Sequence, residues 1–393
     1  MSYSGKVLPI IVIAQFFCTS LWFAGNAVME DLRQQLNLDA SALGHLTSAV
    51  QVGFIAGTLL FALLSVADRF SPSKVFFFCA LAGALLNLGM IFEGNSLQSL
   101  LSLRILTGFF LAGIYPVGMK IASDYYRENL GKSLGYLVGA LVLGTAFPHL
   151  LKFATGAGDL SWKLVLQVVS SMAAAGGLLI LLLVPDGPYR KLLLKRDTAA
   201  FFKIFKQKRF KAAAFGYFGH MWELYAFWAF VPVMLQVFEL LHPDIKIKVG
   251  LLSFIIIAAG GPACVAGGYM SRRYGSKKIA AIALFLSGCC CLFFPLIVLN
   301  NSVVVFGLFM TFWGAVVVAD SPLFSTLVAI NSPEENKGTA LTIVNCIGFA
   351  ITIVSIQLFS LLMESTDSVA VFSLLATGPA LGLLGLLRHS WKK

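Results

Sequence analysis

Three ionisable side chains stand inside long apolar stretches of the sequence, namely Arg104, Glu223 and Asp320. If these stretches cross a membrane, each such group costs at least about 2.5–3.5 kcal/mol to insert, so it should face a cavity or a partner. The chemistry open to these groups is the binding of an opposite charge or the uptake and release of a proton.

Arg104 could bind a carboxylate or a similar anion through both ends of its guanidinium group. Gly108 and Tyr115 follow four and eleven residues later, a spacing that predicts one shared face on a continuous helix. The alternative is a fixed counter-charge for an acidic side chain, and the sequence leaves both open.

Glu223 is the candidate for proton binding, with His220 one helical turn earlier. A carboxyl group whose surroundings differ between inward-open and outward-open states can bind a proton in one state and release it in the other. The alternatives are a permanent hydrogen bond to a neighbouring helix, or a position facing lipid. His220 and Glu223 could also share a metal ion, but two local ligands are too few for a site, so we predict no metal and no cofactor.

Asp320 follows Trp313 by seven residues, which predicts a shared helix face, and it precedes Ser321-Pro322. The Ser-Pro pair predicts an opened helix turn at this point. Asp320 could be a second protonation site or a contact for a cationic part of a solute. It could equally pair with Lys120 or Arg127 in an inner gate.

Polar side chains also recur at helical spacing within the apolar stretches. One predicted stripe, which we expect to line a cavity, consists of Gln15, Thr19, Trp22 and Asn26. Asn345 belongs to a similar stripe nearer the C-terminus. The alternative for both stripes is hydrogen bonding between helices without any cavity.

The composition indicates the environment in which these residues work. Of 393 residues, 58% are hydrophobic and 12% are charged, whereas a soluble domain has about 25% charged residues. This excludes a soluble enzyme, and a nucleic-acid partner is not expected despite the net charge of +11, because no soluble basic face is available. The seven cysteines all lie in apolar runs and predict neither disulfides nor a metal site.

Twelve apolar stretches are long enough to cross a lipid bilayer as helices. They are predicted near 7–29, 43–66, 75–93, 97–121, 132–153, 164–184, 212–238, 249–270, 279–299, 303–328, 338–362 and 369–387. The fold class is therefore all-α membrane protein. We expect an N-terminal six-helix bundle over 1–185, a cytoplasmic basic amphipathic linker over 186–211, and a C-terminal six-helix bundle over 212–393.

The basic residues predict the orientation of the spans. With both termini in the cytoplasm, 23 of the 29 Lys and Arg residues fall on that side. We therefore expect a multi-pass protein of the bacterial inner (plasma) membrane, and we expect it to work as a monomer.

The two halves repeat one another at fixed spacing. Gly108 to Pro116 parallels Gly314 to Pro322 at an offset of 206 residues, and Asp68-Arg69 stands in a loop that matches the loop around Arg272-Arg273. Two parallel six-helix halves are typical of transporters.

These residues resemble the major facilitator superfamily along nearly the whole chain. Its loop motif G-x-x-x-D-R-x-G-R-K is matched at Asp68 and Arg69, and in the second half at Arg273, although Arg272 replaces the acid there. The resemblance implies a cytoplasmic gate formed by Asp68, Arg69 and Arg273; the alternative is a loop that only fixes the orientation. Ala140 stands where an antiporter motif has proline, which disfavours drug/proton exchange.

Other phrases look like members grouped with nitrate/nitrite and cyanate porters, among them the segments 20–28 and 222–228. The glycine-dense signature and paired arginines of true nitrate porters are missing, so that substrate is not implied.

Together these features predict a transporter and not an enzyme. We expect a proton-coupled symporter that moves a small organic solute by alternating access, with the lipid bilayer, protons and the solute as its partners. The solute is anionic if Arg104 is its binding site and not a counter-charge. The alternatives are an uncoupled facilitator or exporter, including metal or drug efflux, and a non-transporting membrane sensor.

Overall fold

The computed structural model of the chain describes residues 4–126, 130–157, 161–190, 205–333, 337–366 and 368–388. These residues form helices and connecting segments, with no β-strand in the described ranges. The chain divides into two compact units, Met1–Leu194 and Lys195–Lys393. Most of the predicted basic linker, including Phe201 and Phe202, lies outside the described residues.

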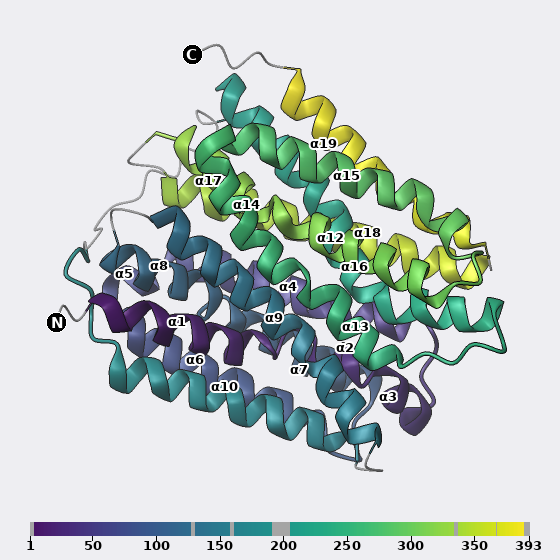
Figure 1. Cartoon of the computed structure of the whole chain (residues 1–393). Coiled ribbons are helices and arrows are strands. Elements are labelled where there is room, and N and C mark those ends of the chain that lie inside the picture. The colour runs from purple at the N-terminus through teal and green to yellow at the C-terminus, as the bar shows by residue number, and fades with distance from the viewer. Residues whose placement is uncertain are drawn as a thin grey trace. The chain divides into compact units, whose positions relative to one another are not determined.

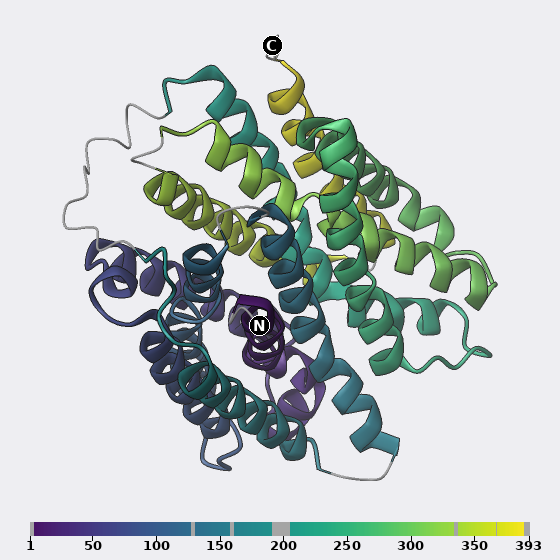
Figure 2. The ribbon, with the colours of Figure 1, turned by 60° about the vertical axis from the view of Figure 1, so that its left-hand side comes forward.

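The described residues of the first unit form ten helical segments, which make up six spans. Figure 1 shows their arrangement. They are α1 (Ser4–Thr19), α2 (Ala24–Ala27), α3 (Met29–Leu36), α4 (Ala42–Leu63), α5 (Val66–Arg69), α6 (Pro72–Gly89), α7 (Leu97–Leu111), α8 (Tyr115–Tyr125), α9 (Leu130–Ala157) and α10 (Lys163–Leu183). In Figure 2, α1 lies among the other helices of this unit, and it packs against α8, α9 and α10.

The described residues of the second unit repeat this plan with nine helical segments. They are α12 (Lys208–Leu241), α13 (Val249–Ala258), α14 (Gly260–Tyr274), α15 (Ser276–Ile297), α16 (Val303–Ala319), α17 (Ser321–Ile330), α18 (Lys337–Ser365), the 3₁₀-helix η2 (Val369–Ala376) and α19 (Thr377–Leu387). Within the described part of the chain, eleven helical stretches are long and apolar enough to cross a membrane, and the shorter apolar helix Val7–Thr19 completes the expected twelve.

Several predicted spans are interrupted, and proline explains most of the breaks. The fourth span breaks at Ala112–Ile114 and the tenth at Asp320, each just before a proline in the first turn of the next helix, Pro116 and Pro322. Proline is compatible with a helix start, but it has no backbone N–H and its ring clashes with the carbonyl four residues earlier, so it interrupts the helix that precedes it. The break at Asp320 agrees with the opened turn that Ser321-Pro322 predicted.

Glycine allows neighbouring spans to approach closely at corresponding positions of the two halves. A Cβ atom at Gly108 would lie 2.0 Å from the carbonyl oxygen of Val50, and one at Gly314 would lie 1.9 Å from that of Ile256. Only a residue without a side chain fits such a backbone approach. The helices α4 and α7 in the first unit, and α13 and α16 in the second, therefore form closely packed pairs.

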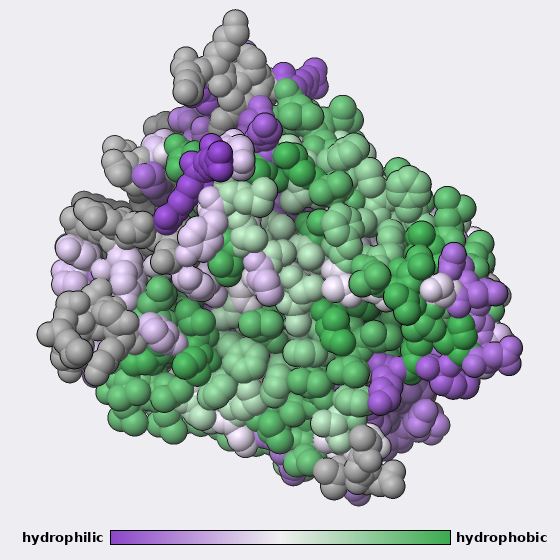
Figure 3. Space-filling model, viewed as in Figure 1, coloured by the Kyte–Doolittle hydropathy of each residue, from purple (hydrophilic) through white to green (hydrophobic). Residues whose placement is uncertain are grey.

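Large apolar side chains on the outer helix faces remain exposed to the surroundings. Leu182 on α10 is 73% exposed and Leu292 on α15 is 60% exposed. Figure 3 shows hydrophobic side chains along the helix walls and hydrophilic ones near helix ends. Such a surface fits the hydrocarbon core of a bilayer.

Candidate functional site

Glu223 lies on α12 inside the second unit, with 1% of its surface exposed. Three donors converge on its Oε1 atom: the Ser287 hydroxyl, the Cys291 thiol at 3.2 Å and the indole Nε1–H of Trp313 at 2.7 Å. Ser287 and Cys291 stand one turn apart on α15, and Trp313 is on α16. One carboxylate oxygen therefore links three spans.

His220 and Asp320 meet one helical turn away from Glu223. His220 Nδ1 lies 2.8 Å from Asp320 Oδ1, and each side chain is only 1% exposed. Asp320 stands in the break between α16 and α17, where Leu323 and Phe324 donate their backbone N–H groups to its carbonyl oxygen. The ring centroids of Tyr217 and Phe324 each lie 6.0 Å from that of the imidazole.

The second unit thus brings four predicted residues into one buried region. Trp313 joins it through its indole N–H, and its ring packs against Phe227 with a centroid distance of 4.5 Å. Asp320 does not turn toward Trp313, as their shared face suggested, but toward His220.

Among the described residues, no three His, Cys, Asp or Glu side chains are arranged to hold a metal ion. Asn345 lies half-buried on α18 and has no side-chain hydrogen bond with a described residue.

Arg104, on α7 in the first unit, is fully buried and bonds to the backbone of the first span. Its Nη1 atom donates to the carbonyl oxygen of Leu21 at 3.1 Å, and its Nη2 atom donates to that of Trp22. Leu21 and Trp22 lie in the break between α1, which ends at Thr19, and α2, which begins at Ala24, where backbone carbonyls are not all paired within a helix. In this structure the partners of Arg104 are therefore backbone carbonyls. The sequence predicted an acidic side chain or a bound anion instead.

Two geometric predictions from the sequence are wrong for the same reason. The stripe Gln15, Thr19, Trp22 and Asn26 assumed one continuous helix, but the break at residues 20–23 separates its members. The eleven-residue spacing of Arg104 and Tyr115 predicts a shared face only on a continuous helix, but α7 ends at Leu111 and α8 begins at Tyr115.

The stripe residues nevertheless lie in the interior of the first unit. Asn26 donates from Nδ2 to the Thr47 hydroxyl on α4 at 2.7 Å. The ring of Trp22 packs on the ring of Phe54, which is also on α4, with centroids 4.8 Å apart. Gln15 is 0% exposed, and its amide has no hydrogen-bond partner among the described residues.

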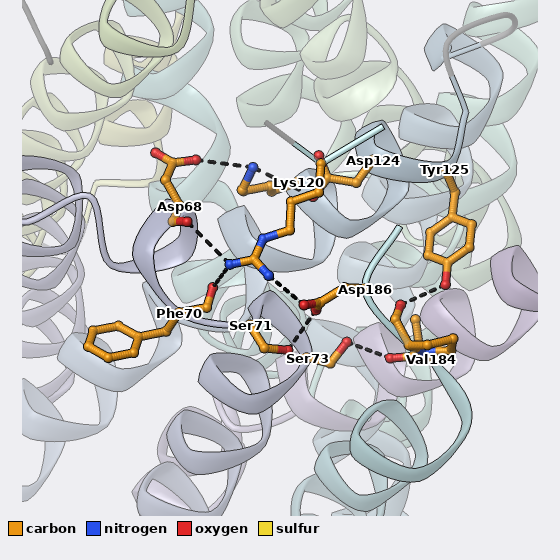
Figure 4. A network of polar contacts seen from close by, with 11 residues as sticks. Asp68, Phe70, Ser71, Ser73, Lys120, Asp124, Tyr125, Val184 and Asp186 are labelled. Atoms are coloured by element: carbon orange, nitrogen blue, oxygen red, sulfur yellow. Dashed lines mark hydrogen bonds and ion pairs between the residues drawn. The ribbon is translucent and has the colours of Figure 1, made fainter. Parts of the chain in front are cut away.

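The predicted gate acid, Asp68, pairs with a lysine. Lys120 Nζ on α8 lies 3.1 Å from Asp68 Oδ1 and 3.5 Å from Asp124 Oδ2, and Figure 4 shows the three side chains together. Arg69, next to the acid, is exposed. In the second unit, the guanidinium of Arg273 lies over the ring of Tyr274 at 5.4 Å. Arg127, the other basic candidate for this gate, lies outside the described residues.

The start of the linker is hydrogen-bonded to the segment that holds Asp68, within the first unit. Arg190 Nη2 donates to the carbonyl oxygens of Asp68 and Phe70, at 3.2 and 2.8 Å, and Arg190 also pairs with Asp186. Asp186 in turn accepts from the Ser71 hydroxyl at 2.7 Å (Figure 4). The residues after α10 therefore belong structurally to the end of the unit that holds Asp68.

Several of these partners were not predicted from the sequence. Ser287 and Cys291 share a face of one span, and this spacing of small polar side chains is the signal that could have identified them. Gln51 on α4 was also missed, although a glutamine inside an apolar helix is a signal of the same kind. Lys120 was considered only for Asp320, because an ion pair between distant segments leaves no local pattern.

The comparisons with known proteins agree with this architecture. The family model of the Major Facilitator Superfamily matches residues 11–356. The uncharacterized transporter YgaY of Escherichia coli O157:H7 is 28% identical over 183 residues, which cover 43% of this chain and 43% of that protein. The matched region thus spans less than half of this relative.

Solved transporter structures share the fold at low sequence identity. A mutant of the nucleoside transporter NupG aligns with a TM-score of 0.74 and 15% identity, over 98% of this chain and 99% of that chain. The human organic anion transporter MFSD10 (TETRAN) aligns with a TM-score of 0.70 and 14% identity, over 98% and 100% of the two chains. At these identities the likeness concerns the fold alone. With its apolar helices and a family match over most of its length, the chain is a multi-pass membrane protein that belongs to the Major Facilitator Superfamily.

Proposed function

We propose that this protein is a secondary active symporter that couples the movement of a small organic solute to protons. The observation that carries the proposal is the buried carboxyl group of Glu223, on which donors from two other spans converge. The solute, the coupling ion and the direction of transport are all part of the proposal.

The arrangement around Glu223 supports proton binding at a defined atom. Ser287, Cys291 and Trp313 all point their donors at Oε1, so that oxygen accepts hydrogen bonds whether or not the carboxyl group is protonated. A proton would therefore reside on Oε2. Donors to the carboxylate favour its charged form, whereas burial favours the neutral form.

Motion between spans would change this balance. The donors stand on α15 and α16, while Glu223 stands on α12. If the spans shift as the protein alternates between its two open states, donors are lost or gained and the proton affinity of Glu223 changes. His220 and Asp320 are the second proposed proton site, because an imidazole 2.8 Å from a buried carboxylate can share a proton with it.

Arg104 has a different place in the proposal. Its two Nη atoms donate to the carbonyl oxygens of Leu21 and Trp22, which lie in the break of the first span. We therefore propose Arg104 as a positioning residue that holds the broken first span. The remaining proposals are the cytoplasmic termini, the bacterial inner membrane, the gating role of Asp68 and its neighbours, the grouping with nitrate/nitrite and cyanate porters, and function as a monomer.

Proton coupling is tested with Glu223→Gln in proteoliposomes under an imposed pH gradient, using a solute identified by thermal stabilisation of the purified protein. An amide cannot release a proton, so the variant should still exchange solute across the membrane but should not accumulate it. Glu239→Gln is the matched control, since Glu239 is on the same helix and bonds to the backbone N–H of Ile247 near the end of that helix. Full accumulation by Glu223→Gln would contradict the proposal.

The same assays separate the rival functions. An uncoupled facilitator equilibrates the solute in the wild-type protein and never accumulates it when a gradient is imposed. A non-transporting sensor binds a ligand, or none at all, without any solute entering the vesicles.

A further inference from the structure

A glutamine in the first unit has an amide that nothing around it satisfies. Gln51, on α4, is 0% exposed, and neither its Oε1 nor its Nε2 has a hydrogen-bond partner among the described residues. A buried amide without partners is destabilising, and such groups are few in folded proteins, so each one calls for an explanation.

The neighbours of Gln51 on α4 define the direction in which it points. Thr47, one turn earlier, accepts a hydrogen bond from Asn26, and Phe54, one turn later, packs on Trp22. Residues spaced four and three apart on a helix share one face. Gln51 therefore lies on the face of α4 that meets the broken part of the first span, between Trp22 and Asn26.

One charged side chain, Arg104, contacts this break. Both Nη atoms of Arg104 donate to the carbonyls of Leu21 and Trp22. A ligand beside Gln51 would meet an amide that offers one acceptor and two donors.

The hydrogen-bonding capacity of the amide selects the chemical class of its partner. A carboxylate has only acceptors and would leave Oε1 of Gln51 unpaired, while an ammonium group has only donors and would leave Nε2 unpaired. A carboxamide, or a pair of hydroxyl groups, has both a donor and an acceptor and can satisfy the two atoms together.

We propose that Gln51 binds the transported solute through its side-chain amide, and that the group it binds is uncharged and carries both a donor and an acceptor. This inference rests on the proposed transport of a small organic solute. It replaces the anionic class expected from the sequence with an uncharged polar one.

The first test asks whether a solute-sized molecule reaches residue 51 from water. Gln51→Cys is treated with 2-hydroxyethyl methanethiosulfonate, and the modification of residue 51 is followed by mass spectrometry of its peptide. Val50→Cys is the matched control, because Val50 is equally buried but its backbone lies against Gly108 of α7. We expect Gln51→Cys to react at least about tenfold faster than Val50→Cys, and equal rates would overturn the proposal.

The second test addresses the charge of the solute. The anionic reagent 2-sulfonatoethyl methanethiosulfonate has a similar size, and each rate is divided by the rate of the same reagent with a free thiol in solution. After this correction the uncharged reagent should react with Gln51→Cys at least about tenfold faster than the anionic one. An anionic reagent that reacts as fast would show that the proposed class is wrong.

A third variant keeps the proposal testable if Gln51→Cys does not fold. Gln51→Leu removes the unpartnered amide at similar volume, so it should melt at or above the wild-type temperature, with the exposed Gln98→Leu as control. A lower melting temperature would show that the amide has a structural partner, and would contradict a role in solute binding. None of these measurements involves a proton gradient, so they can fail while proton coupling through Glu223 holds, and the reverse.

Discussion

The close approach of α16 to α13 predicts opposite outcomes for two glycine substitutions on one helix. A Cβ atom at Gly314 would lie 1.9 Å from the carbonyl oxygen of Ile256, whereas ordinary contacts begin at 3.4 Å. The two helices would have to separate by about 1.5 Å, and a backbone carbonyl cannot rotate away as a side chain can. At Gly307, on the same helix, an added Cβ would meet nothing within 4 Å.

The magnitudes follow from these distances. Alanine is favoured over glycine in a helix by about 1 kcal/mol, and both variants gain this term. Overpacking a close contact costs about 1–3 kcal/mol, and the Gly314 variant should lie at the upper end because the clash involves backbone. We therefore expect Gly314→Ala to be destabilised by about 2 kcal/mol and Gly307→Ala to be stabilised by about 1 kcal/mol.

Unfolding of both variants can be measured in detergent with a thiol-reactive dye. All seven cysteines are free, and six of them are buried, so they react when the helices separate. Wild-type protein and Gly307→Ala supply the reference melting curves. If Gly314→Ala melts at or above the temperature of Gly307→Ala, the backbone approach of α13 and α16 described here is wrong.

Two further predictions concern ion pairs of the first unit. Lys120→Met should lower the free energy of unfolding by about 1–3 kcal/mol, because it leaves Asp68 and Asp124 without the lysine cation at a site that is only partly exposed. Lys120→Arg should restore most of this stability. Equal melting temperatures of Lys120→Met and the wild-type protein would contradict the prediction. The hydrogen bond and charge of Lys163 hold the pKa of the exposed Glu93 below its usual value. The resulting stabilisation is present above the unfolded-state pKa and is lost as pH falls through the lowered one, so Glu93→Gln should melt slightly below wild type at pH 7 and together with it in acid.

The positions of the spans could be predicted from the sequence because hydropathy depends on local composition. The predicted stretch 249–270 corresponds to Val249–Tyr274, and 279–299 corresponds to Ser276–Ile297. The break at Asp320 was also predictable, since Pro322 marks it. The break in the first span was not, because residues 20–23 read Ser-Leu-Trp-Phe and contain neither proline nor glycine.

Partners across the fold were harder to predict, for a physical reason. The sequence identified Glu223, Asp320 and Arg104 because an ionisable side chain in an apolar run is conspicuous. It could not identify what they bind, because those partners include a hydroxyl, a thiol and backbone carbonyls that look ordinary in the sequence. The missed break in the first span also explains why Arg104 was expected to need an acid or an anion.

The matching breaks in the fourth and tenth spans bear on how the two halves could have diverged. Ile114 and Asp320 occupy the same position of the 206-residue repeat, each two residues before a proline. The kink is therefore present with an apolar side chain in one half and with a carboxylate in the other. After duplication of an ancestral half, a residue at such a kink can acquire or lose a charge without altering the helix path. The half with Ile114 would then keep only the kink, while the half with Asp320 would also gain an ionisable group at the kink.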